Sequence, residues 1–494
     1  MEIKSFVKNK RIIPYLIAFL ALEIALILML KGSGARMTLV AGVTVIPVGL
    51  AIIYYMFSSF QNALLLSLFC IPLMPVLGYI MLRLDLLKYQ WILYVAFYIV
   101  SALALIRNGL ISKINIKNIK TNNKYIKIAL ILLLVVNIVF AYNKLLSFMI
   151  IMLSFVPFIT YMLIIKAIEP SERQKLMDKV LFSVSFGCLI SSMPDLLFFF
   201  MNWMMGRRGI RGFGPFAGNY ILVYDLIILV IALNKVVKYK SIKNKWNIIL
   251  LGLLIVISTQ VSRGAFFTFI AIMVAYIIFN FKNYKLYLPV FLIVTCLLGY
   301  NVMHRPDVAN DTSINEIKDI LANDKPNEEL EEEQEIIENV EDKSNILIKL
   351  INTQSITRQA IWKATLDITY DYPYTGVGIG NLQYFFDDYT TGKKGYADAH
   401  NFMLNMSCEL GVPFMALAML LLIISGVVEF IKFFKEKNSN IKLNRLSFVI
   451  ICGVIFAYGN LTGIALQLTN EVYSFVSTFI LIFVLFYRDV IEEV

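Results

Sequence analysis

RQAIWKATLDITYDYPYTGVGIGNLQYFF spans residues 358–386, and DAHNFMLNMSCELGVP follows at residues 398–413. On a helix Arg358 shares a face with Trp362, because residues four apart align. The proline and glycines that follow cannot continue this helix, so an irregular backbone is expected. A new apolar helix is expected from near Phe402, directly after His400. The stretch therefore sets a cation and a titratable base on two anchored elements.

Outside this stretch the chain is strongly hydrophobic. Its 494 residues are 59% hydrophobic and 16% charged, with a mean hydropathy of +0.73, whereas soluble domains carry roughly 25% charged residues. The composition predicts an integral membrane protein. The net charge of +11 does not call for nucleic acid, because cytoplasmic loops of membrane proteins collect Lys and Arg. The five cysteines show no paired spacing, so neither disulfides nor a metal cluster is expected.

About fourteen apolar runs approach the roughly 20 residues that cross a bilayer. Their centres lie near Phe19, Ile46, Phe69, Phe97, Leu133, Met152, Phe186, Ile227, Leu254, Ala271, Leu292, Leu420, Ile455 and Ile480. The basic N-terminus and the first run are interpreted as an uncleaved first helix. We therefore expect an all-α polytopic membrane protein with about 12–14 transmembrane helices and a long, partly helical extracytoplasmic loop.

Alternate loops are rich in cations, and they fix an expected orientation. These loops are 4–11, 107–127, 166–179, 235–245, 282–285 and 432–445. The positive-inside rule then places both termini in the cytoplasm. The chain divides into about eleven N-terminal transmembrane helices (1–302), a large extracytoplasmic loop (303–402) and about three C-terminal transmembrane helices (403–494). An acidic insert at 323–342 is expected to be solvated, without a direct chemical role.

Arginines in the expected outer segments run against this charge rule. GRRGIRGFGPFAGNY lies at 206–220 and TQVSRGAFF at 259–267. One reading is that the arginines snorkel to lipid phosphates. The other is a converging anion site, because the planar guanidinium makes two parallel hydrogen bonds to phosphate. The residues concerned are Arg207, Arg208, Arg211, Arg263 and Arg358.

The order of these motifs resembles the O-antigen ligase and Wzy-type O-antigen polymerase superfamily. It consists of RGFGPFAGNY, SRGA, Arg-x-x-x-Trp followed by P-x-x-G-x-G, and a His-Asn leading into ELG, over about the last three fifths of the chain. The resemblance implies transfer of glycan from a polyprenyl-pyrophosphate-linked donor at the outer face of the cytoplasmic membrane. By that resemblance the catalytic residues are His400, Arg358 and Arg263.

Five further residues are candidates for binding substrate, namely Arg208, Arg211, Asn219, Asn401 and Trp362. Arg211 and Asn219 fall in the earlier motif, which in the family reads closer to R-x-x-G-x-F-x-N-P-N. The implied partners are a lipid-linked oligosaccharide, a saccharide or lipid-glycan acceptor, membrane lipids, and a flippase and chain-length regulator of the same pathway. No cofactor, metal or nucleic acid is expected.

The chemistry can also be argued from the bond that breaks. Pyrophosphate leaves a sugar C1 as a stabilised anion, so the site needs charge compensation more than a general acid. A single histidine suits deprotonation of the acceptor hydroxyl, and direct displacement inverts the anomeric centre. A repeat-unit polymerase is the preferred reading. A ligase that transfers finished polymer, a transporter or flippase of the lipid-linked saccharide, and a structural role for His400 stay open.

Overall fold

The computed structural model describes residues 49–74, 76, 90–119, 124–206, 219–239, 244–284, 287–304, 355–389, 399 and 401–462. In these residues the regular structure is helical, without a strand, which confirms the expected all-α class. The predicted spans centred on Phe19, Ile46 and Ile480 lie outside the described residues. The other predicted centres all fall within helices.

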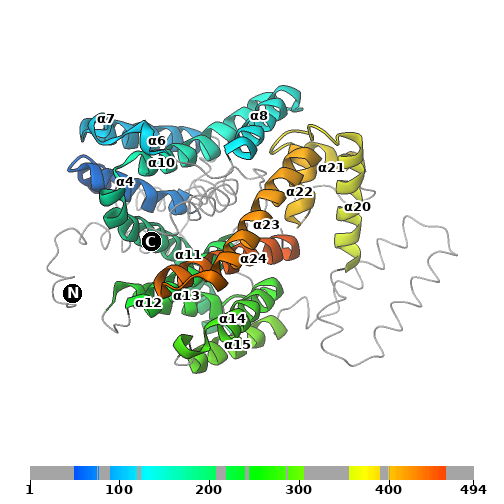
Figure 1. The fold of residues 1–494 in the computed structure, drawn as a ribbon. Coiled ribbons are helices and arrows are strands. Elements are labelled where there is room, and N and C mark those ends of the chain that lie inside the picture. The colour runs from blue at the N-terminus through cyan, green and yellow to red at the C-terminus, as the bar shows by residue number, and fades with distance from the viewer. Residues whose placement is uncertain are drawn as a thin grey trace, which may run out of the picture.

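The helices at the top of Figure 1 come from the first part of the chain. They are α4 (Phe60–Cys70), η1 (Ile71–Leu73), α6 (Gln90–Arg107), α7 (Leu110–Lys113), η3 (Ile116–Asn118), α8 (Lys124–Phe140), α9 (Lys144–Ile150), the π-helical η4 (Ile151–Phe155) and α10 (Val156–Ala167). A sharp corner joins α8 to α9, where the side chain of Asn143 caps α9 by accepting from Leu146 N at 3.0 Å. This corner contacts residues 377–381, which belong to the candidate site.

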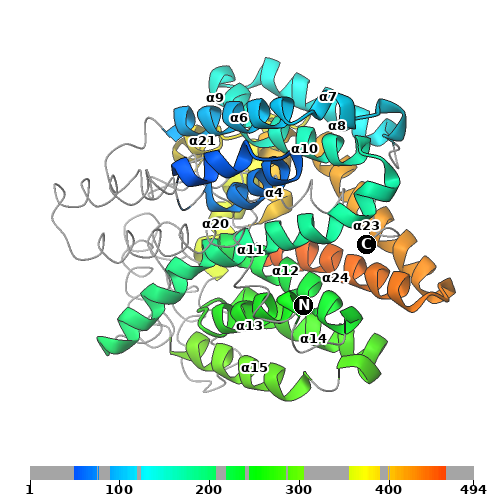
Figure 2. The same ribbon diagram turned by 90° about the vertical axis from the view of Figure 1, so that its left-hand side faces the viewer.

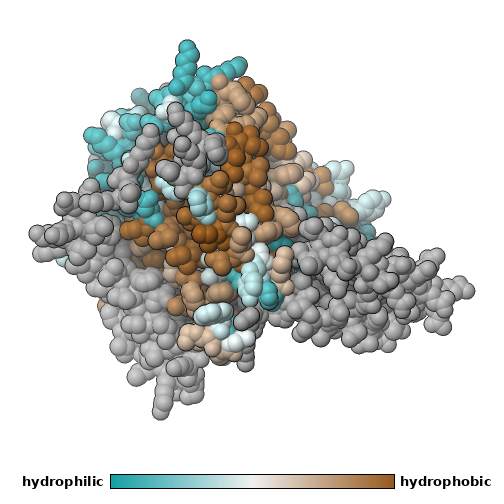
Figure 3. All heavy atoms as spheres, turned by 90° about the horizontal axis from the view of Figure 1, so that it is seen from below, coloured by the Kyte–Doolittle hydropathy of each residue, from teal (hydrophilic) through white to brown (hydrophobic). Residues whose placement is uncertain are grey.

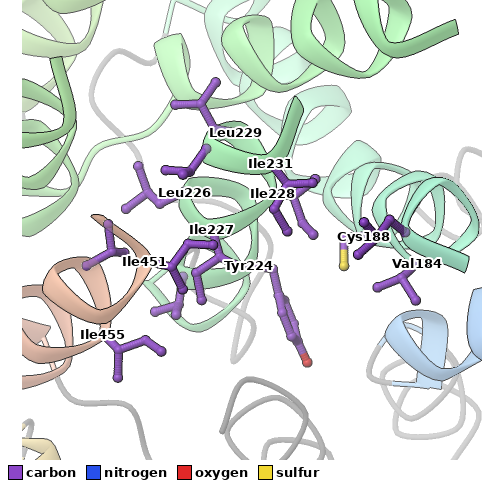
Figure 4. Close-up of a cluster of buried hydrophobic side chains, with 14 of the residues drawn as sticks. Val184, Cys188, Tyr224, Leu226, Ile227, Ile228, Leu229, Ile231, Ile451 and Ile455 are labelled. Atoms are coloured by element: carbon purple, nitrogen blue, oxygen red, sulfur yellow. The ribbon is translucent and has the colours of Figure 1, made fainter. Parts of the chain in front are cut away.

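The second group forms the centre and the lower part of the molecule (Figure 1). It consists of α11 (Pro170–Met204), α12 (Asn219–Tyr239), α13 (Lys245–Ser258), α14 (Arg263–Tyr284) and α15 (Leu288–Met303). Helix α12 packs against α11, α13, α14 and α24 (Ser439–Thr462), and its side chains from 222 to 237 are all buried. Figure 4 shows Ile227 of α12 between the side chains of α24 and those of α11. A helix that is apolar all round is stable only when other helices cover it.

The remaining helices are α20 (Ser355–Asp371), α21 (Gln383–Tyr389), α22 (Phe402–Leu410) and α23 (Val412–Lys435). In Figure 1, α20 and α21 stand at the right edge, with α22 beside them. The three share a small apolar cluster formed by Ile361, Ala364, Ile368, Val377, Leu382, Phe386, Ala399 and Cys408. Helices α22 and α23 connect this group to the central bundle through contacts with α24.

Several described helices suit a bilayer. Pro170–Met204, Arg263–Asn280, Val412–Lys435 and Ser439–Asn460 are long and apolar enough to cross one, and shorter apolar helices accompany them. Large hydrophobic side chains such as Ile248, Leu251 and Leu292 are exposed on helices near the bottom of Figure 1. Seen from that side, the surface shows a broad hydrophobic area bounded by hydrophilic groups (Figure 3). The protein is a multi-pass membrane protein.

Two ring contacts and one side-chain hydrogen bond establish how α14 and α24 run relative to each other. Phe279 of α14 lies 5.9 Å from the Phe433 ring, and Lys442 of α24 lies 4.9 Å over the same ring. Further along, Tyr276 of α14 lies beside Ser447 of α24. With increasing distance from Phe433, the residue numbers therefore fall along α14 and rise along α24. The two helices are antiparallel.

The far ends of α14 and α24 also lie together, because the two helices extend about equally far from the contact at Phe433. At about 1.5 Å per residue, Arg263 lies about 24 Å from Phe279, and Asn460 lies about 27 Å from Lys442. Arg263 and Asn460 are therefore at one end of the bundle, which we call the Asn460 end. The opposite end carries Phe433. It is called the basic end, because its helix termini are rich in Lys and Arg. Figure 2 shows α23 and α24 running side by side.

Candidate active site

The glycine-rich loop after α20 closes onto the C-terminus of α22. Val377 N donates to Cys408 O at 2.9 Å, and Gly378 N donates to Glu409 O at 3.0 Å. These bonds satisfy carbonyl groups that the end of a helix leaves without an intrahelical partner. Gly376 has φ +65°, and a Cβ there would lie 2.4 Å from the Glu409 carbonyl. Glycine is required because the backbone is left-handed and in contact with another backbone.

The peptide around His400 is held through both of its neighbours. His400 itself lies outside the described residues. Trp362 Nε1 of α20 donates to Ala399 O at 2.9 Å, and Ala399 N donates to Asn405 Oδ1 of α22 at 2.9 Å. Ala399 is fully buried. Two helices therefore fix the backbone immediately before His400.

Asn401 fixes the backbone immediately after His400. Its Oδ1 accepts from Met403 N at 3.0 Å and from Leu404 N at 3.1 Å, so it is the N-cap of α22. Its Nδ2 donates to Asn460 O of α24 at 3.4 Å, and Met403 N also donates to Asn460 Oδ1 at 3.4 Å. The predicted helix start at Phe402 is confirmed. The His400 peptide is thus tied to the Asn460 end of the bundle.

The two predicted catalytic arginines lie on helices that reach this end. Arg358 lies in α20 one turn before Trp362, so both occupy the helix face that meets Ala399; the Arg358 side chain is not among the described groups. Arg263 is the first residue of α14, as predicted. Ser262 caps the N-terminus of this helix, because Ala265 N donates to its Oγ at 3.4 Å. The structure therefore places Ala399, Asn401, Arg263 and the Arg358 backbone on elements that reach one end of the bundle.

The other predicted binding residues divide into two groups. Trp362 and Asn401 are described, and both make the structural hydrogen bonds given above. Asn219 is the first residue of α12, but its side chain is not described. Arg208 and Arg211 lie outside the described residues. Roles in substrate binding for all five stay predictions.

Electrostatics outside the membrane spans also tie α20 to α21. The Tyr389 hydroxyl donates to the Asp371 carboxylate, and this hydrogen bond, with smaller effects from burial and nearby carboxylates, raises the pKa of Tyr389 to about 12. Among the described residues, no group of three His, Cys, Asp or Glu side chains lies together as metal ligands would. A metal-independent reaction remains a prediction.

The asparagine side chains that hold these elements together were not predicted from the sequence. Asn405 and Asn460 secure the His400 peptide, and Asn137 of α8 contacts both the glycine-rich loop and the end of α22. One signal was present in the sequence, because Asn137 interrupts the apolar run LLLVVNIVF. Polar residues inside membrane helices usually face a protein interior.

Fold and site together define a multi-pass helical membrane protein whose polar elements gather at one end of the bundle. The family model described as O-Antigen ligase matches residues 246–419, a segment that contains Arg263, Arg358 and His400. The chain therefore contains a segment that matches the O-antigen ligase family, which confirms the resemblance seen in its motifs and supports an O-antigen ligase-type membrane enzyme. Searches of curated proteins and of solved structures gave no match.

Proposed function

We propose that the protein joins glycan from a polyprenyl-pyrophosphate-linked donor to a saccharide acceptor, as a repeat-unit polymerase of a cell-surface polysaccharide. The supporting observation is the clamped His400 peptide. Trp362 and Asn405 hold the residue before His400, and Asn460 holds the residue after it. Arg263 begins a helix at the same end of the bundle. A base next to α22 and cations on α14 and α20 would suit a reaction that releases a pyrophosphate.

The proposed orientation follows from charge. Lys432, Lys435 and Lys442 lie at the basic end, together with Lys238 and Lys245. The positive-inside rule places this end in the cytoplasm, and we propose the same side for both termini. The Asn460 end then faces outward from the cytoplasmic membrane, where a lipid-linked donor would meet its acceptor.

In the proposed step the acceptor oxygen forms a bond to the donor C1 as the bond from C1 to the pyrophosphate oxygen breaks. The electron pair leaves with the polyprenyl pyrophosphate, whose charge Arg263 and Arg358 stabilise. His400 takes the proton of the acceptor hydroxyl. Direct displacement inverts the anomeric configuration and needs no metal ion.

Further contacts and partners belong to the same proposal. Arg208 and Arg211 add positive charge for the pyrophosphate, while Asn219, Asn401 and Trp362 contribute hydrogen bonds or ring contact to the saccharide. Membrane lipids surround the spans. A flippase would deliver the donor to the outer face, and a chain-length regulator would determine when polymerisation stops.

The test is single-turnover release of polyprenyl pyrophosphate from a purified lipid-linked oligosaccharide. We expect release together with a lengthened saccharide from the native chain. His400→Ala and Arg358→Ala should each lower the rate by at least about 100-fold while the protein stays folded. Binding of the lipid without release under any acceptor would point to a transporter and overturn the proposal.

Ligase-type transfer is the second candidate, because the matching family is described by that activity. It uses the same donor chemistry with a different acceptor. Offering a lipid-linked oligosaccharide and a lipid-glycan acceptor in separate reactions distinguishes the two. Transfer to the lipid-glycan alone would assign the chain as a ligase.

A further inference from the structure

Asn137 lies in the last turn of α8, more than 200 residues away in sequence from the segments it contacts. Its Nδ2 donates to Thr375 O at 2.7 Å and to Glu409 O at 2.7 Å, and its Oδ1 accepts from Ile379 N at 3.1 Å. The side chain is 1% exposed. Both amide protons and the amide oxygen are therefore used on three backbone positions.

A second set of bonds joins the same loop to the corner between α8 and α9. Tyr142 N donates to Val377 O at 3.0 Å, and Asn143 N donates to Asn381 Oδ1 at 3.0 Å. Asn381 Nδ2 donates to Ser147 Oγ at 2.8 Å, and Ser147 Oγ donates to Ile379 O at 2.9 Å. The loop is thus hydrogen-bonded along its length to one rigid turn of the N-terminal helices.

Close backbone packing explains why this contact is rigid. A Cβ at Gly378 would lie 2.4 Å from Ala141 Cβ, and a Cβ at Gly411 would lie 2.3 Å from Tyr374 O. Val412 N donates to Pro373 O at 2.8 Å. The loop, the α22–α23 junction and the α8–α9 corner therefore interlock with no room for a side chain between them.

This arrangement places the segments that carry two of the proposed catalytic residues. Arg358 is carried by α20, directly before the loop, and His400 directly precedes α22, whose C-terminus Asn137 contacts. Arg263 is carried by α14, in another part of the bundle. The alignment of Arg358 and His400 with Arg263 therefore depends on two anchors, which are Asn460 on α24 and Asn137 on α8.

We propose that Asn137 is a positioning residue for glycan transfer, which sets the placement of the glycine-rich loop and of α22 against the membrane helices. It touches no substrate and acts through the backbone at Thr375, Ile379 and Glu409. The proposal rests on the glycosyl-transfer function proposed above. Small displacements of reacting groups lower turnover steeply, whereas binding of the donor depends on the arginines themselves.

The first test replaces Asn137 by an isosteric side chain that lacks both donors. Asn137→Asp keeps the acceptor for Ile379 N but sets a carboxylate oxygen against two carbonyl oxygens. We expect kcat to fall at least about tenfold while the donor KM changes by less than about threefold. The matched control is Asn444→Asp, at the basic end, where Asn444 Oδ1 accepts from Asn234 Nδ2 at 2.9 Å. Its kcat and KM should stay within about threefold of the native values.

A second test does not depend on transfer. Spin labels at Val139→Cys on α8 and Lys363→Cys on α20, both exposed positions, report the distance between the anchor and the catalytic helix, with the exposed Cys296 replaced by serine. We expect one narrow distance distribution with Asn137 and a broad or shifted one with Asn137→Ala. An unchanged distribution would overturn the positioning role, as would Asn137→Asp kinetics equal to those of Asn444→Asp.

The two measurements separate failure of this proposal from failure of the proposed function. Absence of transfer by the native chain, combined with a distance change in Asn137→Ala, would refute the proposed function and leave the anchor in place. Native transfer with an unchanged distance would refute the anchor alone.

Discussion

The two ends of the bundle hold their buried polar side chains in different ways. At the basic end ion pairs predominate, alongside the amide hydrogen bond between Asn234 and Asn444. Asp178 of α11 pairs with Lys235 at 3.2 Å and with Lys245 at 2.8 Å, and Glu429 of α23 pairs with Arg445 of α24. At the Asn460 end, asparagine, serine and tryptophan side chains bond mainly to backbone groups, through Asn137, Ser147, Trp362, Asn381, Asn401, Asn405 and Asn460.

The difference follows from what each end must do. Ion pairs lock helices together, but each pair adds fixed charges of both signs. Near a proposed anionic ligand a carboxylate would compete for the arginines that are proposed to bind pyrophosphate. Neutral amides can satisfy several backbone groups without adding charge. The comparison teaches that rigidity at the Asn460 end is achieved with hydrogen bonds to the backbone, while helix pairing at the basic end uses charge.

At the Asn460 end, the largest loss of stability is expected when a methyl group is added in the glycine-rich loop. Gly376→Ala places a Cβ 2.4 Å from the Glu409 carbonyl, on a backbone with φ +65°. We expect a loss of unfolding free energy of about 3 kcal/mol or more, because strain and a backbone clash add. Transfer activity should fall to background. Thermal unfolding in detergent and turnover measure the two effects.

Gly453→Ala in α24 is the matched control. No atom lies within 4 Å of a Cβ there, so alanine should be neutral or stabilise the helix by up to about 1 kcal/mol. Equal stability of the Gly376 and Gly453 variants would contradict the interlocking described for the loop.

The next largest effect tests the ionic side of the comparison. Glu429→Gln removes the charge that faces Arg445, and both side chains are buried. Breaking a buried pair costs about 3 kcal/mol, so the unfolding midpoint should drop. The turnover of the protein that remains folded should not change, because the pair lies at the basic end. Lys432 is an exposed partner of the same carboxylate, with its Nζ 3.1 Å from Glu429 Oε1. Lys432→Met should therefore lower the free energy of unfolding by less than about 0.5 kcal/mol.

A changed donor KM in Glu429→Gln would show that the basic end takes part in substrate binding. That result would break the division between the two ends.

A smaller loss of stability than that of Glu429→Gln is expected from one matched exchange at each end. Trp362 Nε1 donates to Ala399 O at 2.9 Å, and Trp246 Nε1 donates to Asp178 at 3.3 Å. Replacing either tryptophan by phenylalanine removes one hydrogen bond worth about 1 kcal/mol. Trp362→Phe should also lower kcat about tenfold, because the His400 peptide loses an anchor, whereas Trp246→Phe should leave kcat unchanged. Steady-state rates normalised to folded protein decide the matter, and equal kcat values would contradict the positioning argument.

Hydrophobic runs and helix boundaries were predictable from sequence. The starts at Arg263 after Ser262, and at Phe402 after Asn401, were readable because short polar side chains before apolar runs act as N-caps. The order of motifs also identified the family. These signals are local or depend on a fixed order along the chain.

The supports of the candidate site were not predictable in this way. Asn137 and Asn381 bond to segments 234 or more positions away in sequence, and no local pattern encodes such a pairing. The glycines illustrate the limit. Their number predicted an irregular backbone, but the reason for Gly376 is the Glu409 carbonyl, which becomes visible only when α22 is packed against the loop.

The burial of α12 also bears on how the protein is made. Asn234 of α12 donates to Asn444 of α24, a residue that follows 210 positions later. At about 5 to 20 residues per second, ribosomes need about 10 to 40 s to supply that partner. During this interval Asn234 of α12 lacks the partner that α24 provides, whereas Asp225 and Lys235 can already contact Ser192 and Asp178 of α11. The insertion machinery must therefore shelter α12 until the last helices of the bundle emerge, so truncation before α24 is expected to mark the chain for membrane proteolysis.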